Sequence, residues 1–493
     1  MLRKWYILAI VVLIYLPVSI DATVLHVAVP TLIQALQLSN AQMLWIIDIY
    51  PLMMAGLLLP MGALGTRIGY KKLMLAGAAV FGAGSLLAAF APSAAVLIFS
   101  RIILAIGAAM ILPAALACLR STFLDENQRN FALGLWVVAG GGGAAFGPLI
   151  GGALLEHYHW GAVFLINIPI IGAVLAGGNF ILPDQEMNAQ KKINILDSAL
   201  LTAAILLLIY ALKAGLKAYS LNVLLIGLAG AALLYLFMQL QRRRAEPLLD
   251  LTLFQHTAVK TGFLICIFAM MALVGFELLI SQELQFVYGL SPLQAGLFIL
   301  PFMLAVSLSG FFAGALVNRF GVQAVSLWGL AAAAIAFLGL AETSAMEQKY
   351  WAWFWMALLG ISIESAFLAA TSAIISASPV DKAAAAGAIE SMAYELGTGF
   401  GVAVFGLLAS FFYSAKANFR GLMPEQDYEI ARHSIGETAR MLKGADESTA
   451  AAVQALANQA FISAHQLVLQ IFSRTLLLLL LFVWLYGRQR EAQ

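Results

Sequence analysis

Long apolar runs separated by short polar loops constrain this chain more than any other feature. Each run is about 20 residues long, enough to span ~30 Å of hydrocarbon as an α-helix. Hydrophobic residues make up 62% of the 493 positions and charged residues 11%. A soluble fold of this length could not bury so much apolar surface. We therefore expect an all-α polytopic membrane protein.

Fourteen runs qualify as membrane spans. They are residues 6–27, 43–64, 73–91, 95–119, 131–155, 162–182, 196–212, 221–240, 262–280, 292–317, 322–341, 351–375, 384–412 and 461–486. An even number of spans places both termini on one side. Basic residues crowd the loops of that side, among them Arg3, Lys4, Arg67, Lys71, Lys72, Arg120, Arg129, Lys191, Lys192, Arg242, Arg319 and Lys382, whereas the opposite short loops hold only Lys213, Lys217 and Lys349. This bias predicts cytoplasmic termini.

An internal repeat divides the chain. Residues 62–69 (GALGTRIG) follow the second span and residues 314–321 (GALVNRFG) follow the tenth, so glycine, alanine, leucine, arginine and glycine recur at matching positions. Related halves predict a site between them. We expect a six-helix bundle over 1–182, a two-helix insert with cytoplasmic linkers over 183–258, and a second six-helix bundle over 259–493, in a 6 + 2 + 6 plan around a central cavity.

One long polar insertion, residues 414–460, falls on the expected external side. Its first part, 423–444, has helical spacing, and a second helix is expected over 447–459, after Gly444. A helical hairpin over the external mouth is the sharper interpretation. A merely solvated loop is the alternative.

Residues 134–152 combine a predominantly apolar span with glycines and a proline, namely Gly134, Gly143, Gly147, Pro148, Gly151 and Gly152. Small residues at four-residue spacing let two helices approach closely in lipid. Alternatively, the proline and glycines mark a point where the helix bends during a conformational change. Spacing alone leaves both interpretations open.

Acids inside apolar spans are costly, so each is a functional candidate. The candidates for proton coupling and cation binding are Asp21, Asp48, Glu277, Glu364, Glu390 and Glu395, with the base Arg101, and Glu283 lies just past its span. Burial disfavours the charged form of a carboxyl, so such a group can alternate between a proton and an organic cation. The structural alternative is a buried acid paired with Arg101, although one arginine cannot neutralise all of them.

Aromatic and sulfur-containing side chains could line a cation-binding cavity through cation–π and soft contacts. The candidates are Trp45, Tyr50, Met53, Trp136 and Tyr394. The competing interpretation is ordinary packing between helices or at the membrane interface.

No pattern of an enzyme is found. The sequence has no HExxH, no Cys/His metal cluster and no nucleotide-binding loop, and both cysteines lie in apolar runs. We expect no cofactor, no metal and no catalytic residue, and the net charge of +2 gives no indication of a nucleic-acid partner.

The spacing from Gly134 to Gly152 resembles the antiporter motif of drug:proton exporters in the major facilitator superfamily. Other positions resemble the fourteen-helix branch of that family. Residues 21–30 (DATVLHVAVP) resemble its first-helix motif, and the surroundings of Asp48 resemble a second-helix pattern of quaternary-ammonium exporters. Arg101 matches the fourth-helix arginine that is linked to proton transfer in the family. The loop motif with Gly62, Arg67, Gly69 and Lys71 departs from the family at Thr66, where an aspartate is usual, and Asn318 is its counterpart. This departure predicts a weaker cytoplasmic latch and an inward-facing bias.

The resemblance is strongest to methyl-viologen-resistance and quaternary-ammonium exporters. It implies a monomeric bacterial inner-membrane protein that exchanges protons for lipophilic organic cations such as quaternary ammonium biocides, viologens and dyes. Two alternatives stay open: a major-facilitator importer or facilitator of a specific nutrient, and a membrane-embedded enzyme or receptor.

Overall fold

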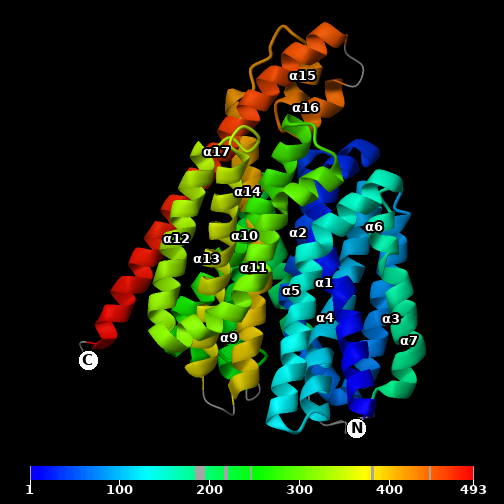
Figure 1. The fold of residues 1–493 in the computed structure, drawn as a ribbon, viewed down its shortest axis with the longest axis vertical. Helices are drawn as coiled ribbons and strands as arrows, with labels where there is room; N and C mark the ends of the chain where they lie inside the picture. The colour runs from blue at the N-terminus through cyan, green and yellow to red at the C-terminus, as the bar shows by residue number, and fades with distance from the viewer. Residues whose placement is uncertain are drawn as a thin grey trace. The chain divides into compact units, whose positions relative to one another are not determined.

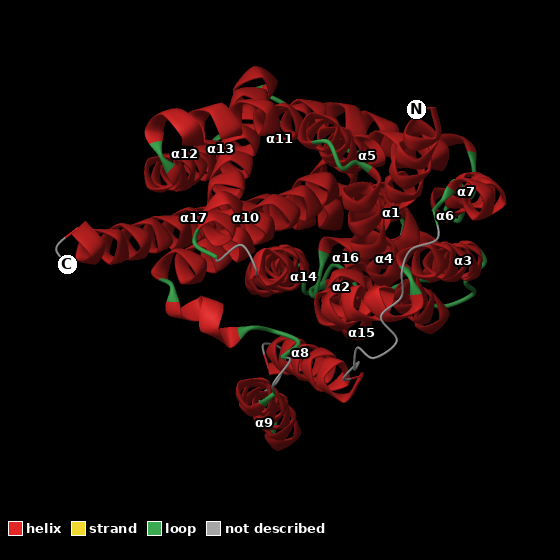
Figure 2. Ribbon diagram, turned by 90° about the horizontal axis from the view of Figure 1, so that it is seen from below, coloured by secondary structure: helices red, strands yellow, loops and turns green. Residues whose placement is uncertain are grey.

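The computed structural model describes residues 2–183, 195–215, 220–244, 247–378, 382–442 and 446–491. Within these ranges the regular structure is helical, apart from one isolated bridge between Arg420 and Met423 (Figure 2). The expected linker with Lys191 and Lys192, and the loop residue Lys217, lie outside the described residues.

Helices occupy all fourteen expected runs (Figure 1). Their bounds are α1 (Leu2–Leu36), α2 (Asn40–Ile68), α3 (Tyr70–Ala89), α4 (Ala94–Thr122), α5 (Glu126–His157), α6 (Ala162–Leu165), α7 (Asn167–Ile181), α8 (Ile195–Gly215), α9 (Leu221–Arg243), α10 (Thr257–Gln282), α11 (Pro292–Phe320), α12 (Val322–Glu342), α13 (Lys349–Ser376), α14 (Ala383–Lys416) and α17 (Glu447–Glu491). Among the described residues, thirteen helical spans are long and apolar enough to cross a membrane. Counted as one span, α5, bent by 41° between Phe131–Ala144 and Phe146–His157, makes a fourteenth. The polytopic all-α prediction is confirmed.

The chain forms two compact units whose limits differ from the expected division at 182 and 258. Unit 1 comprises Met1–Leu25, Ile49–Ile150 and His157–Leu251, so it includes α8 and α9 of the insert. Unit 2 comprises His26–Asp48, Gly151–Glu156 and Thr252–Gln493. Unit 2 therefore holds the C-terminal part of α1 and the N-terminal part of α2. The three-part division made from the sequence stays a prediction.

The internal repeat is visible in the backbone. Gly69 separates α2 from α3 with φ 94°, and Gly321 separates α11 from α12 with φ 82°. A side chain strongly disfavours positive φ, so both tight helix junctions require glycine. The matching sequence motifs therefore build the same backbone turn in each half of the chain.

Residues 414–460, called the capping loop below, are folded over their described parts, 414–442 and 446–460. Two short helices, α15 (Glu425–Ala431) and α16 (Ile435–Met441), lie beside the N-terminal part of α17 (Figure 1). The sequence predicted one helix over 423–444 and a separate one over 447–459. The first helix is divided, because Ser434 caps a new helix after α15. The second is helical from Glu447, as predicted, but it continues without a break into the last span.

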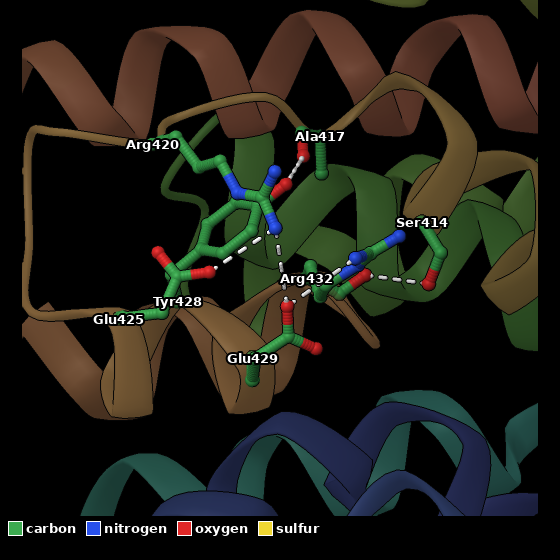
Figure 3. A network of polar contacts seen from close by, with 7 residues as sticks. All are labelled: Ser414, Ala417, Arg420, Glu425, Tyr428, Glu429 and Arg432. Atoms are coloured by element: carbon green, nitrogen blue, oxygen red, sulfur yellow. Dashed lines mark hydrogen bonds and ion pairs between the residues drawn. The ribbon is translucent and has the colours of Figure 1, made fainter.

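The capping loop has a core of its own. Its buried side chains are Tyr413, Ala417, Phe419, Tyr428, Ala431, Ile435, Val453, Ala457, Ala460, Phe461 and Ala464. Around the Tyr428 ring, Arg420 bonds to Glu425 at 3.1 Å and Arg432 lies 3.5 Å from Glu429, while both guanidinium groups lie 5.3–5.6 Å from the ring centre (Figure 3). This packing excludes a merely solvated loop.

Candidate functional site

The acid of α1 is paired. Asp21 forms a short ion pair with Arg101 of α4, and the two side chains are 0% and 1% exposed. The guanidinium also lies 4.4 Å from the centre of the Tyr50 ring. The structure thus realises the alternative of a buried acid beside Arg101. Pairing offsets the cost of burying either charge, and loss of one partner would strand the other.

The glycines of α5 receive the helix that carries Asp21. A Cβ added to Gly143 would lie 2.1 Å from Ser19 Oγ, and one added to Gly147 would lie 2.1 Å from Thr23 Oγ1. Both hydroxyl groups are one turn or less from Asp21 along α1. In unit 1 the motif is therefore a close-packing surface for α1, as small residues allow in membrane helices.

Pro148 adds a specific polar link to this interface. Proline has no N–H, so the carbonyl four residues earlier, on Ala144, loses its helical donor. The Thr23 hydroxyl donates to that carbonyl at 2.8 Å. One turn away, the Ser19 hydroxyl donates to the Gly140 carbonyl at 2.8 Å. The 41° bend of α5 is thus accompanied by one replacement hydrogen bond, from Thr23, and one additional hydrogen bond, from Ser19. Close packing against α1 is therefore observed at Gly143 and Gly147, whereas bending of α5 during a conformational change stays a prediction.

The other motif glycines have different surroundings. Gly134 has no atom within 4 Å of an added Cβ. Gly151 and Gly152 belong to unit 2, where a Cβ on Gly152 would lie 2.7 Å from Leu293 Cα at the start of α11. The motif therefore makes more than one helix contact.

Three acids of α13 and α14 form a cluster in unit 2. Glu390 accepts hydrogen bonds from Thr371 at 3.4 Å and Ser391 at 3.2 Å, and it lies within electrostatic range of both Glu364 and Glu395. Glu395 is 8% exposed and the other two are half-buried. Among the described residues, no basic side chain lies at ion-pair distance from any of the three. Within the described part of the chain, their charge is therefore not balanced by a basic side chain.

Two further acids have histidine partners that the sequence did not indicate. Glu277 Oε2 lies 3.1 Å from His26 Nδ1, and Glu283 forms a short contact with His465 of α17. Glu283 had been placed just past its span. Instead α10 continues into a π-helical turn, η2 (Glu283–Val287), and Glu283 is 7% exposed. No Gly or Pro interrupts 276–287, a signal that could have predicted the extension.

The aromatic candidates lie with separate neighbours. Trp136 stacks on Tyr15 with ring centres 4.5 Å apart, and Tyr50 lies under Arg101. Tyr394 is 37% exposed and meets Phe367 edge-on at 5.8 Å.

Asp48, Trp45 and Met53 belong to α2. Asp48 is fully buried, whereas Trp45 and Met53 are half-buried. A shared cavity lined by these residues and the aromatic candidates stays a prediction.

The loop motif of residues 62–69 has a threonine hydrogen bond in place of the expected acid. Thr66 Oγ1 lies 2.9 Å from the Tyr70 hydroxyl and 3.3 Å from the Gly62 carbonyl, and Arg67 is exposed. Thr66 therefore makes a local hydrogen bond at the position where an acid was expected.

Among the described residues, no group of three or more His, Cys, Asp or Glu side chains could hold a metal ion.

The comparisons with known proteins agree with this architecture. The family model described as Major Facilitator Superfamily matches residues 11–402. The chain is 49% identical to the methyl viologen resistance protein SmvA of Salmonella typhimurium strain 14028s over 98% of each chain, and 35% identical to the multidrug efflux pump LfrA of Mycolicibacterium smegmatis over 92% and 90% of the two chains. A solved bacterial homolog of the human lysosomal transporter Spinster, in an inward-facing and unoccupied conformation, is 17% identical with TM-score 0.69 over 99% and 97%.

Proposed function

The chain belongs to the major facilitator superfamily and is a multi-pass membrane transporter, and we propose that it exports lipophilic organic cations in exchange for protons. The proposal includes quaternary ammonium compounds, viologens and cationic dyes as substrates. The names of its relatives support export, since one confers methyl viologen resistance and another is a multidrug efflux pump. Methyl viologen is a dication, so an acidic site suits it.

The observation that carries the proposal is the acid cluster Glu364, Glu390 and Glu395. These carboxyls lie in membrane-spanning helices with no basic partner at ion-pair distance among the described residues. Charged groups at such depth are costly unless a proton or a counter-ion neutralises them. A cation and a proton therefore compete for the same carboxylates. This competition produces exchange without covalent chemistry.

The pair Asp21–Arg101 has a different role in this scheme. Because Arg101 already neutralises Asp21, a substrate cation gains little from this acid while the pair is intact. Protonation of Asp21 would release the guanidinium, which would remain on the Tyr50 ring. We place the pair in the conformational cycle, where proton binding loosens α1 from α4, and we place cation binding at the glutamates.

We further propose that the protein works as a monomer in a bacterial inner membrane with both termini in the cytoplasm. The bias of lysine and arginine toward one set of loops supports this orientation. It places the capping loop outside. Alternating access between the two halves then moves protons inward and cations outward.

Transport into proteoliposomes tests the proposal. With an acidic lumen and an alkaline exterior, the wild-type protein should accumulate methyl viologen, and an ionophore that collapses the pH gradient should stop accumulation. Glu390→Gln and Glu395→Gln should reduce accumulation at least tenfold. The matched control is Glu347→Gln, an exposed acid in the loop between α12 and α13, which should transport normally.

Two results would count against this function. A pH gradient that moves no organic cation would argue against the exporter. Cation movement in the same direction as the protons would indicate an importer instead.

A further inference from the structure

His26 and Glu277 attach α1 to α10. They are 1% and 0% exposed, with 3.1 Å between Nδ1 and Oε2. Beside them, the Ser281 hydroxyl donates to the His26 carbonyl at 2.9 Å, and the Gln285 amide donates to the Val27 carbonyl at 3.0 Å. The C-terminal part of α1 is therefore held on α10 and η2 by two hydrogen bonds and one acid–histidine pair, all within unit 2.

Glu277 depends on His26 for charge compensation. Neither Glu277 oxygen has a hydrogen-bond donor of good geometry among the described residues, and His26 Nδ1 has none either. A buried carboxylate without donors or a counter-ion is strongly disfavoured. We infer that the docked pair is electrically neutral and holds one proton, carried either by the imidazole beside a carboxylate or by the carboxyl itself.

The neighbouring ionisable groups do not supply this compensation. The elements packed against α10 carry several ionisable groups: Glu390, Glu395, Tyr413 and Lys416 on α14, Lys349 and Glu364 on α13, His465 and Arg474 on α17, Glu283 on η2 and Arg319 at the far end of α11. The helix α16, which packs against η2, carries Glu437 and Arg440. His465 contacts Glu283, and Arg440 donates to the Gln37 carbonyl at 2.8 Å. Of the described basic groups, only His26 lies at ion-pair distance from Glu277.

We propose that His26 and Glu277 form a second proton-binding site, which must hold one proton before residues 26–36 of α1 dock on α10. When the segment undocks, water reaches both side chains. A hydrated imidazole loses its proton near pH 6.5 and a hydrated glutamic acid near 4.3. Docking above pH ~6.5 therefore takes up one proton.

Linkage fixes the sign and size of the effect. Above pH ~6.5 the ratio of docked to undocked protein falls up to about tenfold for each added pH unit. Below that pH the hydrated pair already carries one proton, so the ratio becomes flat. This part of the inference rests on the proposed function: the site couples proton uptake from outside to docking of the external end of α1 on α10, as export of a cation requires.

Double electron–electron resonance can measure docking directly. Spin labels at Ala35→Cys on α1 and Met346→Cys between α12 and α13 occupy exposed positions of unit 2, and Cys118→Ser with Cys266→Ser removes the native thiols. The reconstituted protein is titrated from pH 4.5 to 8.5 without any transported cation. We expect the short-distance population to fall as the pH rises above ~6.5.

Two variants give opposite signatures. Glu277→Gln removes the buried charge, so docking should no longer weaken above pH ~6.5; it should weaken below that pH instead, because a hydrated imidazole must then lose its proton in order to dock. His26→Gln leaves a carboxyl that must be protonated by itself, so the pH dependence should extend down to about pH 4.5 instead of flattening near 6.5.

The control is His465→Gln, which breaks an acid–histidine pair that joins α10 to α17, not to α1. It should keep the wild-type titration.

The proposal is overturned if the wild-type population is constant over this range, if Glu277→Gln titrates like the wild type, or if His465→Gln abolishes the dependence. Since no substrate is present, these outcomes are independent of the proteoliposome assay. Normal methyl viologen accumulation with a pH-independent distance would defeat the second proton site and leave the exporter intact.

Discussion

Gly143→Ala should weaken the contact between α5 and α1. Its new Cβ would lie 2.1 Å from Ser19 Oγ, whereas Cβ atoms are rarely found closer than 3.0 Å to another atom. Either the helices separate by about 1 Å or the serine rotates and gives up its 2.8 Å hydrogen bond to Gly140. Overpacking of this kind costs about 1–3 kcal/mol, and a stranded buried polar group costs a similar amount.

The neighbouring glycine provides the control. A Cβ on Gly142 meets nothing within 4 Å. Both substitutions gain the same helix propensity, up to about 1 kcal/mol relative to glycine, so their difference isolates the contact with α1. We therefore expect Gly143→Ala to be less stable than Gly142→Ala by about 1–3 kcal/mol.

Thermal unfolding of the purified variants in detergent gives the comparison. Adding Ser19→Gly to Gly143→Ala removes the clashing hydroxyl and the Cβ at 3.2 Å, so the next contact is the Leu16 carbonyl at 3.5 Å. The double variant should recover part of the loss, a coupling that a double-mutant cycle measures. Equal stability of the two alanine variants, or no recovery in the double variant, would refute the packing argument.

Three further predictions concern polar contacts. Asp21→Asn should lower the stability of the α1–α4 contact and slow transport more than Arg101→Lys, because it strands a buried guanidinium whereas lysine keeps a positive charge beside Asp21; matched thermal and transport measurements compare the two. Arg440→Ala removes the donor to the Gln37 carbonyl, directly after α1, and should raise amide hydrogen exchange at the end of α1 while α15 stays protected. Thr66→Asp should raise labelling of external cysteines, and unchanged labelling would defeat the predicted inward-facing bias.

The sequence predicted the helices well because hydrophobic length is a local property. All fourteen runs are helical, and most of the ends differ from the expected ones by a few residues. The errors fell where local signals compete. Ser434 and Glu437 are three apart, the signature of a helix start, and Ser434 Oγ accepts from the Glu437 N–H at 3.2 Å. That signature was present in the sequence and would have divided the expected helix.

The site was less predictable because partners lie far apart in the chain. The acids were found by their cost in an apolar span, but Asp21 and Arg101 are separated by 80 residues, and Ser281 of α10 bonds to His26 across 255. Helical periodicity does not give the rotation of one helix against another. The pairing of His26 with Glu277 could therefore not be derived, although a histidine at this depth was itself a signal.

Proton release on cation binding tests the central claim most directly. Methyl viologen is added to the purified protein in weakly buffered solution near pH 7, and a pH indicator reports protons set free. The account predicts release by the wild-type protein and little release by the triple variant Glu364→Gln, Glu390→Gln, Glu395→Gln, with the exposed-acid variant Glu347→Gln as control. Methyl viologen that binds the wild-type protein without releasing protons between pH 6 and 8 would contradict the account.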